Sequence, residues 1–306
     1  MDTFLLDHAA QITATVGLVT FALVKKKLTP AGCVTAVTVG TVHMLDPWPV
    51  FVWLLLGFFV LGVVVTKVGH TAKAHLTQSS TGASGSESRG WVQVLANTGA
   101  AIVMIMLHTF LATRTPFISS TVPVSPGPYM PTLQSLLPIG VMAHYAATAA
   151  DTFSSELGIL AKGQPFMITA PWKRVPRGTN GGVTIDGLVY GLLGSSLIAA
   201  ISAFSLYFCT PYQTMDCGAA ALITTMGLLG SVIDSILGAT CQATVTDRGT
   251  GKVVEGPGGQ KVKVLKGGSR VQVGYDLLSN NGVNFVMAAL TSFLAMSAAW
   301  VLDVRL

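Results

Sequence analysis

Long apolar runs, separated by short polar segments, constrain this chain of 306 residues more than any other feature. A run that crosses the roughly 30 Å hydrocarbon core of a bilayer must satisfy its backbone hydrogen bonds internally, which favours helices. Only 10% of the residues are charged, against about 25% in soluble domains. We therefore expect an all-α polytopic membrane protein with a single membrane domain over 1–306 and about eight transmembrane helices. The expected spans are 4–24, 31–45, 49–66, 91–112, 133–161, 185–208, 217–243 and 281–302.

The basic residues alternate between the two sides of this predicted topology. With the N-terminus placed outside, 16 of the 18 lysines and arginines fall in inside loops, and only Arg114 and Arg305 fall outside. Basic residues are enriched in cytoplasmic loops. Both termini are therefore expected on the lumenal side. The positive-inside distribution accounts for the net charge of +5, so the charge does not indicate a nucleic-acid partner.

Two polar segments interrupt the apolar pattern. Residues 76–88 are rich in Ser and Gly and predict a flexible cytosolic loop. Residues 243–274 alternate apolar and polar side chains between Gly-rich turns, which predicts a small cytosolic β-hairpin inserted between the seventh and eighth spans. Its lysines either keep the insert soluble or contact anionic lipid headgroups. Cys209 and Cys217 flank one outside loop, where they form a disulfide or stay as two buried thiols.

Asp151 and Glu156 lie within the apolar run 133–161. A charged side chain deep in a bilayer costs at least about 2.5–3.5 kcal/mol, so these carboxylates should face a polar, protein-lined site. They are five residues apart, about 140° around a helix. Together with Asp234 of another span they predict an oxygen-rich Mg²⁺ site near the cytosolic helix ends. A proton or ion relay, or a set of interhelical hydrogen bonds, would also account for them.

A glycine-rich turn, Gly178-Thr-Asn-Gly-Gly-Val-Thr184, precedes the sixth span. Consecutive glycines let backbone N–H groups approach an anion at a helix N-terminus. Lys173, Arg174 and Arg177 lie just upstream and can neutralise phosphate charge. The same pattern would also fit an ordinary juxtamembrane loop.

A polar stripe opens the fourth span, where Arg89, Gln93 and Asn97 recur every four residues on one helix face. Such a stripe faces either a ligand or other helices, with which it would form structural hydrogen bonds. An intramembrane Asp151-Thr152 pair is followed by a cytosolic connection and an Asn/Gly-rich turn, and the same order recurs with Asp234-Ser235 and the turn at 279–284. Either a parallel repeat or a chance likeness between glycine-rich turns explains this recurrence.

Several of these motifs occur together in a known family. The sequence contains Thr66-Lys67, Arg89-x3-Gln-x3-Asn97, Asp151-Thr-x2-Ser-Glu-x-Gly158, Pro171-x-Lys-x-Val-Pro-x-Gly-Thr-Asn-Gly-Gly-Val-Thr184, Gly230-x3-Asp-Ser-x2-Gly238 and Asn280-Asn-x-Val-Asn284, in that order. In these motifs the chain resembles the transmembrane protein 19 family, which includes the plant phytyl-phosphate kinase. The resemblance extends from about Lys25 to the C-terminus.

The resemblance implies transfer of a phosphoryl group from CTP to an isoprenyl monophosphate lipid, giving the diphosphate. It implies an endoplasmic reticulum location with the active site facing the cytosol, and a homo-oligomer is left open. The expected catalytic residues are Asp151, Glu156, Asp234 and Lys173, of which the three carboxylates would bind Mg²⁺. The expected nucleotide- and phosphate-binding residues are Lys67, Lys73, Arg89, Gln93, Asn97, Arg177, Gly178, Thr179, Asn180, Gly181, Gly182, Asn281 and Asn284. The competing functions are a transporter or flippase of a phosphorylated lipid and a CTP-dependent cytidylyltransferase.

Overall fold

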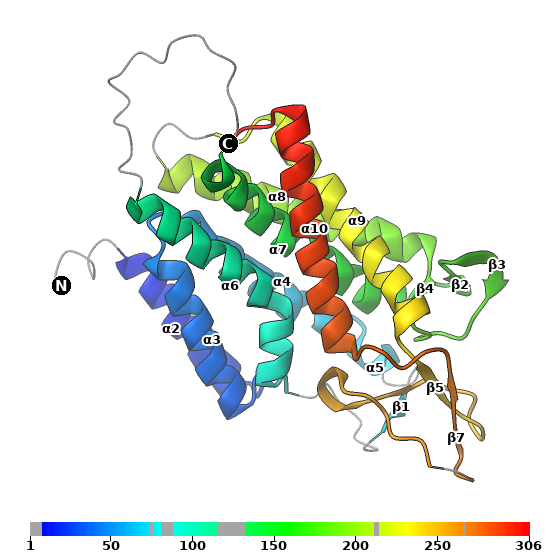
Figure 1. Cartoon of the computed structure of the whole chain (residues 1–306). Coiled ribbons are helices and arrows are strands. Elements are labelled where there is room, and N and C mark those ends of the chain that lie inside the picture. The colour runs from blue at the N-terminus through cyan, green and yellow to red at the C-terminus, as the bar shows by residue number, and fades with distance from the viewer. Residues whose placement is uncertain are drawn as a thin grey trace.

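The computed structural model describes residues 8–73, 76, 78–80, 88–114, 132–210, 214–265 and 267–306. It is mostly helical, and its helices pack side by side (Figure 1). The helices are α2 (Ala9–Val24), α3 (Pro30–Leu45), α4 (Val50–Lys67), α5 (His70–Lys73), α6 (Trp91–Arg114), α7 (Leu133–Gly158), α8 (Ile185–Cys209), α9 (Cys217–Cys241) and α10 (Asn280–Leu302).

Side-chain caps fix where the long helices begin. Thr184 accepts a hydrogen bond from the Gly187 N–H at 3.0 Å, and Asp216 accepts one from the Ala219 N–H at 2.7 Å. Ser279 caps α10 in the same way. Each cap satisfies one of the backbone donors that a helix N-terminus leaves without a partner.

Helix α7 lies at the centre of the bundle, and every residue from 137 to 150 is buried. Small residues of its neighbours allow this close packing. A Cβ added at Gly194 of α8 would lie 2.8 Å from the Ala149 carbonyl oxygen, and one added at Gly230 of α9 would collide with Ala147. Close helix approach through glycine is typical of helix packing in membranes. Polar residues on α7 are therefore surrounded by protein.

Within the described ranges, five helices are long and apolar enough to cross a membrane: α4, α6, α8, α9 and α10. Helices α2 and α3 are apolar but shorter. Helix α7 has 26 residues, so its length suffices, but it is not among the five. The eight predicted spans each overlap one of these helices, although eight crossings stay a prediction.

Short strands lie at one end of the bundle: β1 (Gln78–Ser79), β2 (Phe166–Met167), β3 (Ala170–Arg174), β4 (Gly182–Val183), β5 (Thr244–Asp247), β6 (Val254–Glu255) and β7 (Arg270–Val273). Strands β3, β2 and β4 form one sheet in that order. Between α9 and α10, β5 pairs antiparallel with β7, and β6 pairs parallel with β1. The antiparallel β5–β7 pair lies within the predicted 243–274 insert, and β6 of the same segment in addition pairs with β1 of the 76–88 loop. Residues 81–87 of that loop lie outside the described residues.

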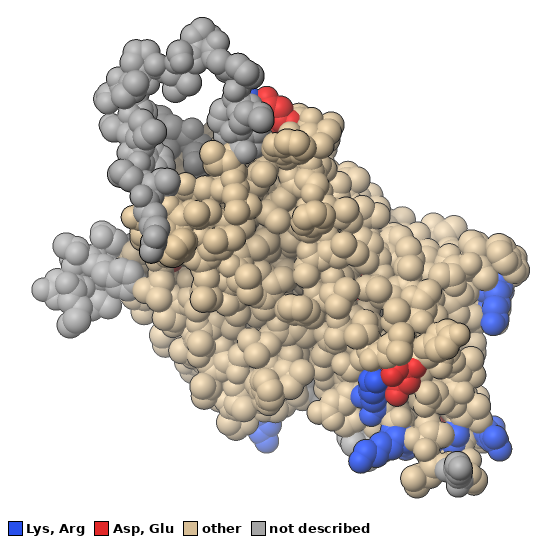
Figure 2. Space-filling view, viewed as in Figure 1, with Lys and Arg blue, Asp and Glu red and all other residues tan. Residues whose placement is uncertain are grey.

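Charge is distributed unevenly over the surface (Figure 2). Lysines and arginines gather at the end of the molecule that carries the strands, whereas the helix flanks in this view are almost free of charge. All four cysteines, Cys33, Cys209, Cys217 and Cys241, are free thiols. The structure therefore favours unpaired thiols over the Cys209–Cys217 disulfide.

Candidate functional site

A cavity of about 630 Å³ opens at the strand-bearing end of the bundle. Side chains of α4, α6, α7, α9 and α10 line it, together with the turn that precedes α8 and the segment between α9 and α10. Most of the predicted site residues are in its wall: Lys73, Arg89, Gln93, Asn97, Asp151, Glu156, Arg177, Gly178, Thr179, Asn180, Gly181, Gly182, Asp234 and Asn284.

Asp151 and Asp234 bring acidic charge into this cavity from two helices. Asp151 lies near the end of α7, and Asp234 lies near the end of α9. The two carboxylates are close enough for the charge of Asp151 to act on Asp234. Like charges that share a water-poor site repel each other, so the pair favours a cation or a shared proton between them. The structure thus brings together the two halves of the sequence recurrence.

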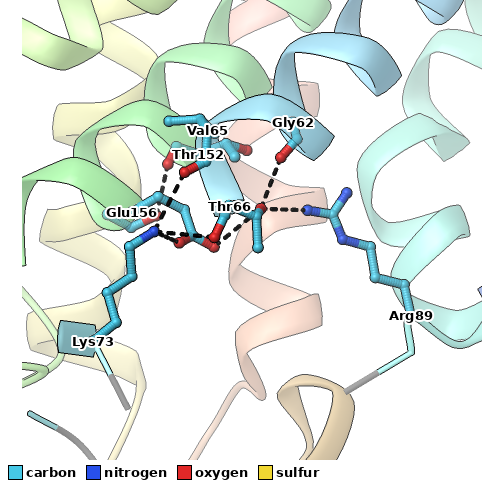
Figure 3. Close-up of polar contacts among 8 residues, drawn as sticks. Gly62, Val65, Thr66, Lys73, Arg89, Thr152 and Glu156 are labelled. Atoms are coloured by element: carbon cyan, nitrogen blue, oxygen red, sulfur yellow. Dashed lines mark hydrogen bonds and ion pairs between the residues drawn. The ribbon is translucent and has the colours of Figure 1, made fainter. Parts of the chain in front are cut away.

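Lys73 neutralises the third predicted carboxylate, Glu156. Its Nζ lies 2.5 Å from Glu156 Oε2 and also donates to the backbone oxygens of Val65 and Thr66. The Thr66 hydroxyl donates to the Gly62 carbonyl at 2.7 Å and lies 3.4 Å from Glu156 Oε1. Figure 3 shows Lys73 on one side of this group and Arg89 on the other. Glu156 is therefore part of a polar network that joins α4, α5 and α7.

The Lys73–Glu156 pair should contribute to stability. Its side chains are only 14% and 27% exposed, so solvent screens the pair less than a surface ion pair. We expect Lys73→Met to cost about 1–2 kcal/mol, between the values for exposed and buried pairs, measured as a lower melting temperature in detergent. The matched control is Arg305→Met, which breaks the exposed Arg305–Asp303 pair and should leave the melting temperature nearly unchanged. Equal shifts in both variants would contradict this.

Asparagines connect α6 and α10 beside the carboxylates. The Asn284 amide lies 3.2 Å from Asn97 Oδ1. In the opposite amide orientation, which satisfies more partners, its nitrogen donates to Asp234 Oδ2 at 3.3 Å and to the Asn280 carbonyl at 3.0 Å. Asn284 therefore positions the Asp234 carboxylate relative to the polar face of α6.

The glycine-rich turn is held tightly against α9. Gly178 and Gly181 have φ values of +81° and +76°, which favour glycine. The Asn180 backbone N–H donates to Thr244 Oγ1 at 3.1 Å, and its side chain donates to the Ala243 carbonyl at 2.9 Å. Asn180 thus anchors the turn to the start of β5, and this structural task is an alternative to the predicted phosphate contact.

Arg177 uses several of its donors within the protein. Nη1 donates to the Ile159 carbonyl at 2.7 Å, and Nη2 lies 3.2 Å from the carbonyl oxygens of Lys162 and Gly163. These carbonyls follow the C-terminus of α7, where a cation is favourable. Arg177 therefore supports the cavity wall in addition to placing positive charge there.

Three predicted site residues do not line the cavity. Lys67 is exposed at the end of α4, and its Nζ lies 5.6 Å from the centre of the Phe21 ring. Lys173 is exposed on β3, because that strand pairs through one edge only and projects beyond the bundle. Asn281 is buried and donates to the Gly258 carbonyl at 2.9 Å, so it supports the segment after β6. These three residues lie outside the cavity wall, and their roles in the site stay predictions.

The segment between α9 and α10 contributes wall residues that the motifs did not predict, among them Glu255, Gln260, Lys261 and Gln272. Lys261 forms an ion pair with Asp276 at 3.1 Å, which ties the segment together beside the cavity. Lys27 also lines the cavity. The alternating pattern of 243–274 indicated strands, but it carried no signal for where those strands would pack.

The donors in the cavity suit Mg²⁺ only in part. No three His, Cys, Asp or Glu side chains of the described ranges lie close enough to hold a metal ion together. The predicted set of Asp151, Glu156 and Asp234 is therefore not assembled in the described part of the chain, and Lys73 forms an ion pair with the Glu156 carboxylate. Mg²⁺ commonly takes only one or two carboxylates and completes its shell with water and substrate phosphates. Asp151 and Asp234 fit this smaller donor set.

Comparisons with known proteins identify relatives over most of the chain. The family model described as integral membrane protein DUF92 matches residues 13–292. Protein PGR of Arabidopsis thaliana is 34% identical over 287 residues, which cover 90% of each chain. The uncharacterized membrane protein MJ0933 of Methanocaldococcus jannaschii is 32% identical over 61% of this chain and 63% of its own. Protein VTE6, chloroplastic, of Arabidopsis thaliana is 27% identical over 70% of this chain and 56% of its own. No solved structure matches.

Proposed function

The chain belongs to the DUF92 family of integral membrane proteins, and from this premise we propose that it transfers a phosphoryl group from CTP to an isoprenyl monophosphate. The protein is a multi-pass membrane protein, so a lipid acceptor can reach it within the bilayer. The choice of CTP and of an isoprenyl tail rests on the motif resemblance to phytyl-phosphate kinase.

One observation carries this proposal: a single cavity contains acidic side chains from two helices and, beside them, cationic side chains and a glycine-rich turn. Asp151 and Asp234 supply the acidic part, and Lys73 and Arg89 lie in the same wall. Phosphoryl transfer needs positioning and charge stabilisation more than covalent participation by the protein. A cavity that offers both signs of charge can hold a nucleotide with its cation and the phosphate of an acceptor.

The chemistry places few demands on a general base. An oxygen of the acceptor monophosphate, already anionic at neutral pH, attacks the γ-phosphorus of CTP. The bond from that phosphorus to the β-phosphate oxygen breaks, CDP leaves, and the acceptor becomes a diphosphate. In this proposal Arg89 binds the acceptor phosphate, and the N–H groups of the 178–182 turn face the nucleotide phosphates.

Asp151 and Asp234 would hold Mg²⁺ when it is bound, and the ion would neutralise charge on the nucleotide phosphates. Lys73 keeps Glu156 in place at the edge of the same site. We assign the cavity to the cytosolic side of the endoplasmic reticulum membrane and the termini to its lumen. The gathering of basic residues at the strand-bearing end of the molecule, where the cavity opens, supports this orientation (Figure 2).

An assay with CTP labelled separately in the γ-phosphate and the cytosine tests the proposal. Purified protein in lipid nanodiscs with Mg²⁺ and farnesyl monophosphate should move the γ-label to the lipid and release labelled CDP. A cytidylyltransferase would instead move the cytosine label to the lipid and release pyrophosphate. A transporter or flippase would consume no CTP. Either of these last two results would overturn the proposed function.

A further inference from the structure

A second, smaller cavity of about 80 Å³ lies between α2, α3, α4 and α6. We name it the apolar groove. Leu18 and Val19 of α2, Val39 of α3, and Leu55 and Phe58 of α4 are among the side chains that line it. The groove is narrow and apolar, so it fits a slender hydrocarbon chain better than a polar ligand.

The apolar groove and the polar cavity meet along α6. Phe59, Arg89, Gln93 and Asn97 line both spaces. Gln93 and Asn97 lie in the first turns of α6, whereas Arg89 precedes the helix in a β-bridge with Leu28, so the predicted helical stripe begins only at Gln93. The groove and the polar cavity share all three side chains. A molecule with an apolar end and a polar end could therefore occupy both spaces at once.

Arg89 lies at this junction, and few groups of the protein neutralise its positive charge. Its Nη2 donates to Thr66 Oγ1 at a long 3.4 Å, and within the described part of the chain it forms no ion pair. Glu156 acts on it electrostatically, but that carboxylate is already held by Lys73. A partly buried cation without a close anion is costly. A bound anion at the end of the groove would remove that cost.

We propose that the apolar groove binds the start of the hydrocarbon tail of a single-chain lipid monophosphate, whose phosphate binds Arg89 at the junction with the polar cavity. The inference rests on the proposed function for the identity of the lipid. It adds a tail-binding site formed by α2, α3 and α4. These helices would then decide which lipid tails the protein accepts. The small volume of the groove favours one chain over the two chains of an ordinary phospholipid.

The substitution Ala36→Phe tests the groove by filling it. Ala36 lines the groove from α3 and is only half-buried, so a larger side chain can be placed there without opening the main core. We expect the KM for farnesyl monophosphate to rise about ten-fold or more, as when a hydrophobic pocket loses room for part of its substrate. The KM for CTP should not change, because the nucleotide phosphates are assigned to the 178–182 turn and not to the groove. The control is Val37→Phe, the next residue on α3, which is exposed and outside the groove.

A binding measurement separates the groove from catalysis. Farnesyl monophosphate that carries a photoreactive diazirine on its tail is cross-linked to wild-type protein without nucleotide, and the labelled peptides are mapped. We expect labels in α3 and α4, displaced by farnesyl monophosphate but not by farnesol or phosphatidic acid, and lost in Ala36→Phe but not in Val37→Phe.

The outcomes distinguish the two proposals. Labelling of α3 and α4 without any turnover of CTP would refute the proposed function and leave the tail site standing. Displacement by phosphatidic acid would make the groove an ordinary phospholipid site and overturn the inference. Turnover with an unchanged KM in Ala36→Phe would also overturn it, as would wild-type labels confined to helices other than α2, α3, α4 and α6.

Discussion

Replacing Asp151 by asparagine should lower the kcat for phosphoryl transfer by about 10²–10³-fold, the effect typical of removing one main stabiliser of transition-state charge. Asp151 lines the cavity from α7, and its charge acts on Asp234 of α9. Asparagine keeps the shape of the side chain but removes the negative charge that would hold Mg²⁺ beside the phosphates. The measurement is the rate of γ-label transfer to farnesyl monophosphate at saturating CTP.

The matched control for this variant is Asp186→Asn. Asp186 is also an aspartate near one end of a long helix, but it is exposed in the first turn of α8 and does not line the cavity. Its replacement should leave kcat within about two-fold, because a surface change away from the site has little effect. A wild-type rate in Asp151→Asn would remove this carboxylate from the proposed mechanism.

The substitution Gly181→Ala should lower the stability of the protein by about 2–4 kcal/mol, combining an unfavourable backbone conformation with overpacking. Gly181 has φ +76°, and a Cβ there would collide with the Ala239 side chain and lie 2.8 Å from its backbone Cα. The Ala239 atoms that the new Cβ would meet cannot rotate away, so the 178–182 turn would have to move away from α9. We therefore also expect a higher KM for CTP, since this turn is assigned to the nucleotide phosphates.

Gly251→Ala separates the two contributions. Gly251 has φ +68°, but nothing lies within 4 Å of a Cβ placed there. The Gly251→Ala variant should lose only the stability that the unfavourable backbone conformation costs, about 1 kcal/mol. Its KM for CTP should be unchanged. Melting temperatures in detergent and initial rates give both quantities. Equal loss of stability in the two variants would mean that contact between the turn and α9 contributes nothing.

The sequence was most informative where a residue type is costly in its surroundings. A carboxylate in an apolar run requires a polar environment, and Asp151 and Asp234 indeed line one cavity. The predicted spans 185–208 and 217–243 begin where α8 and α9 begin, and the caps Thr184 and Asp216 that fix these starts act within one turn of chain. Local chemistry decides both features, so a single sequence contains the required information.

Features that depend on packing between distant segments were less predictable. Lys173 lies beside the glycine-rich turn in sequence, yet β3 carries it to an exposed position outside the cavity. Glu156 resembled a metal ligand, but its partner Lys73 comes from the short helix α5, whose position the sequence pattern did not indicate. The apolar groove arises where α2, α3, α4 and α6 meet, and no single one of these helices carries a sign of it.

The enclosure of α7 also bears on how the protein is made. During synthesis each apolar helix can partition into lipid when it leaves the ribosome, because its own side chains favour that transfer. Helix α7 carries Asp151, Glu156 and His144, and its residues 137–150 are shielded only once its neighbours are present. Helices α8, α9 and α10 follow it in the chain and supply much of that shield. The segment that carries the site thus depends on helices not yet translated, and the site is completed only at the end of biosynthesis.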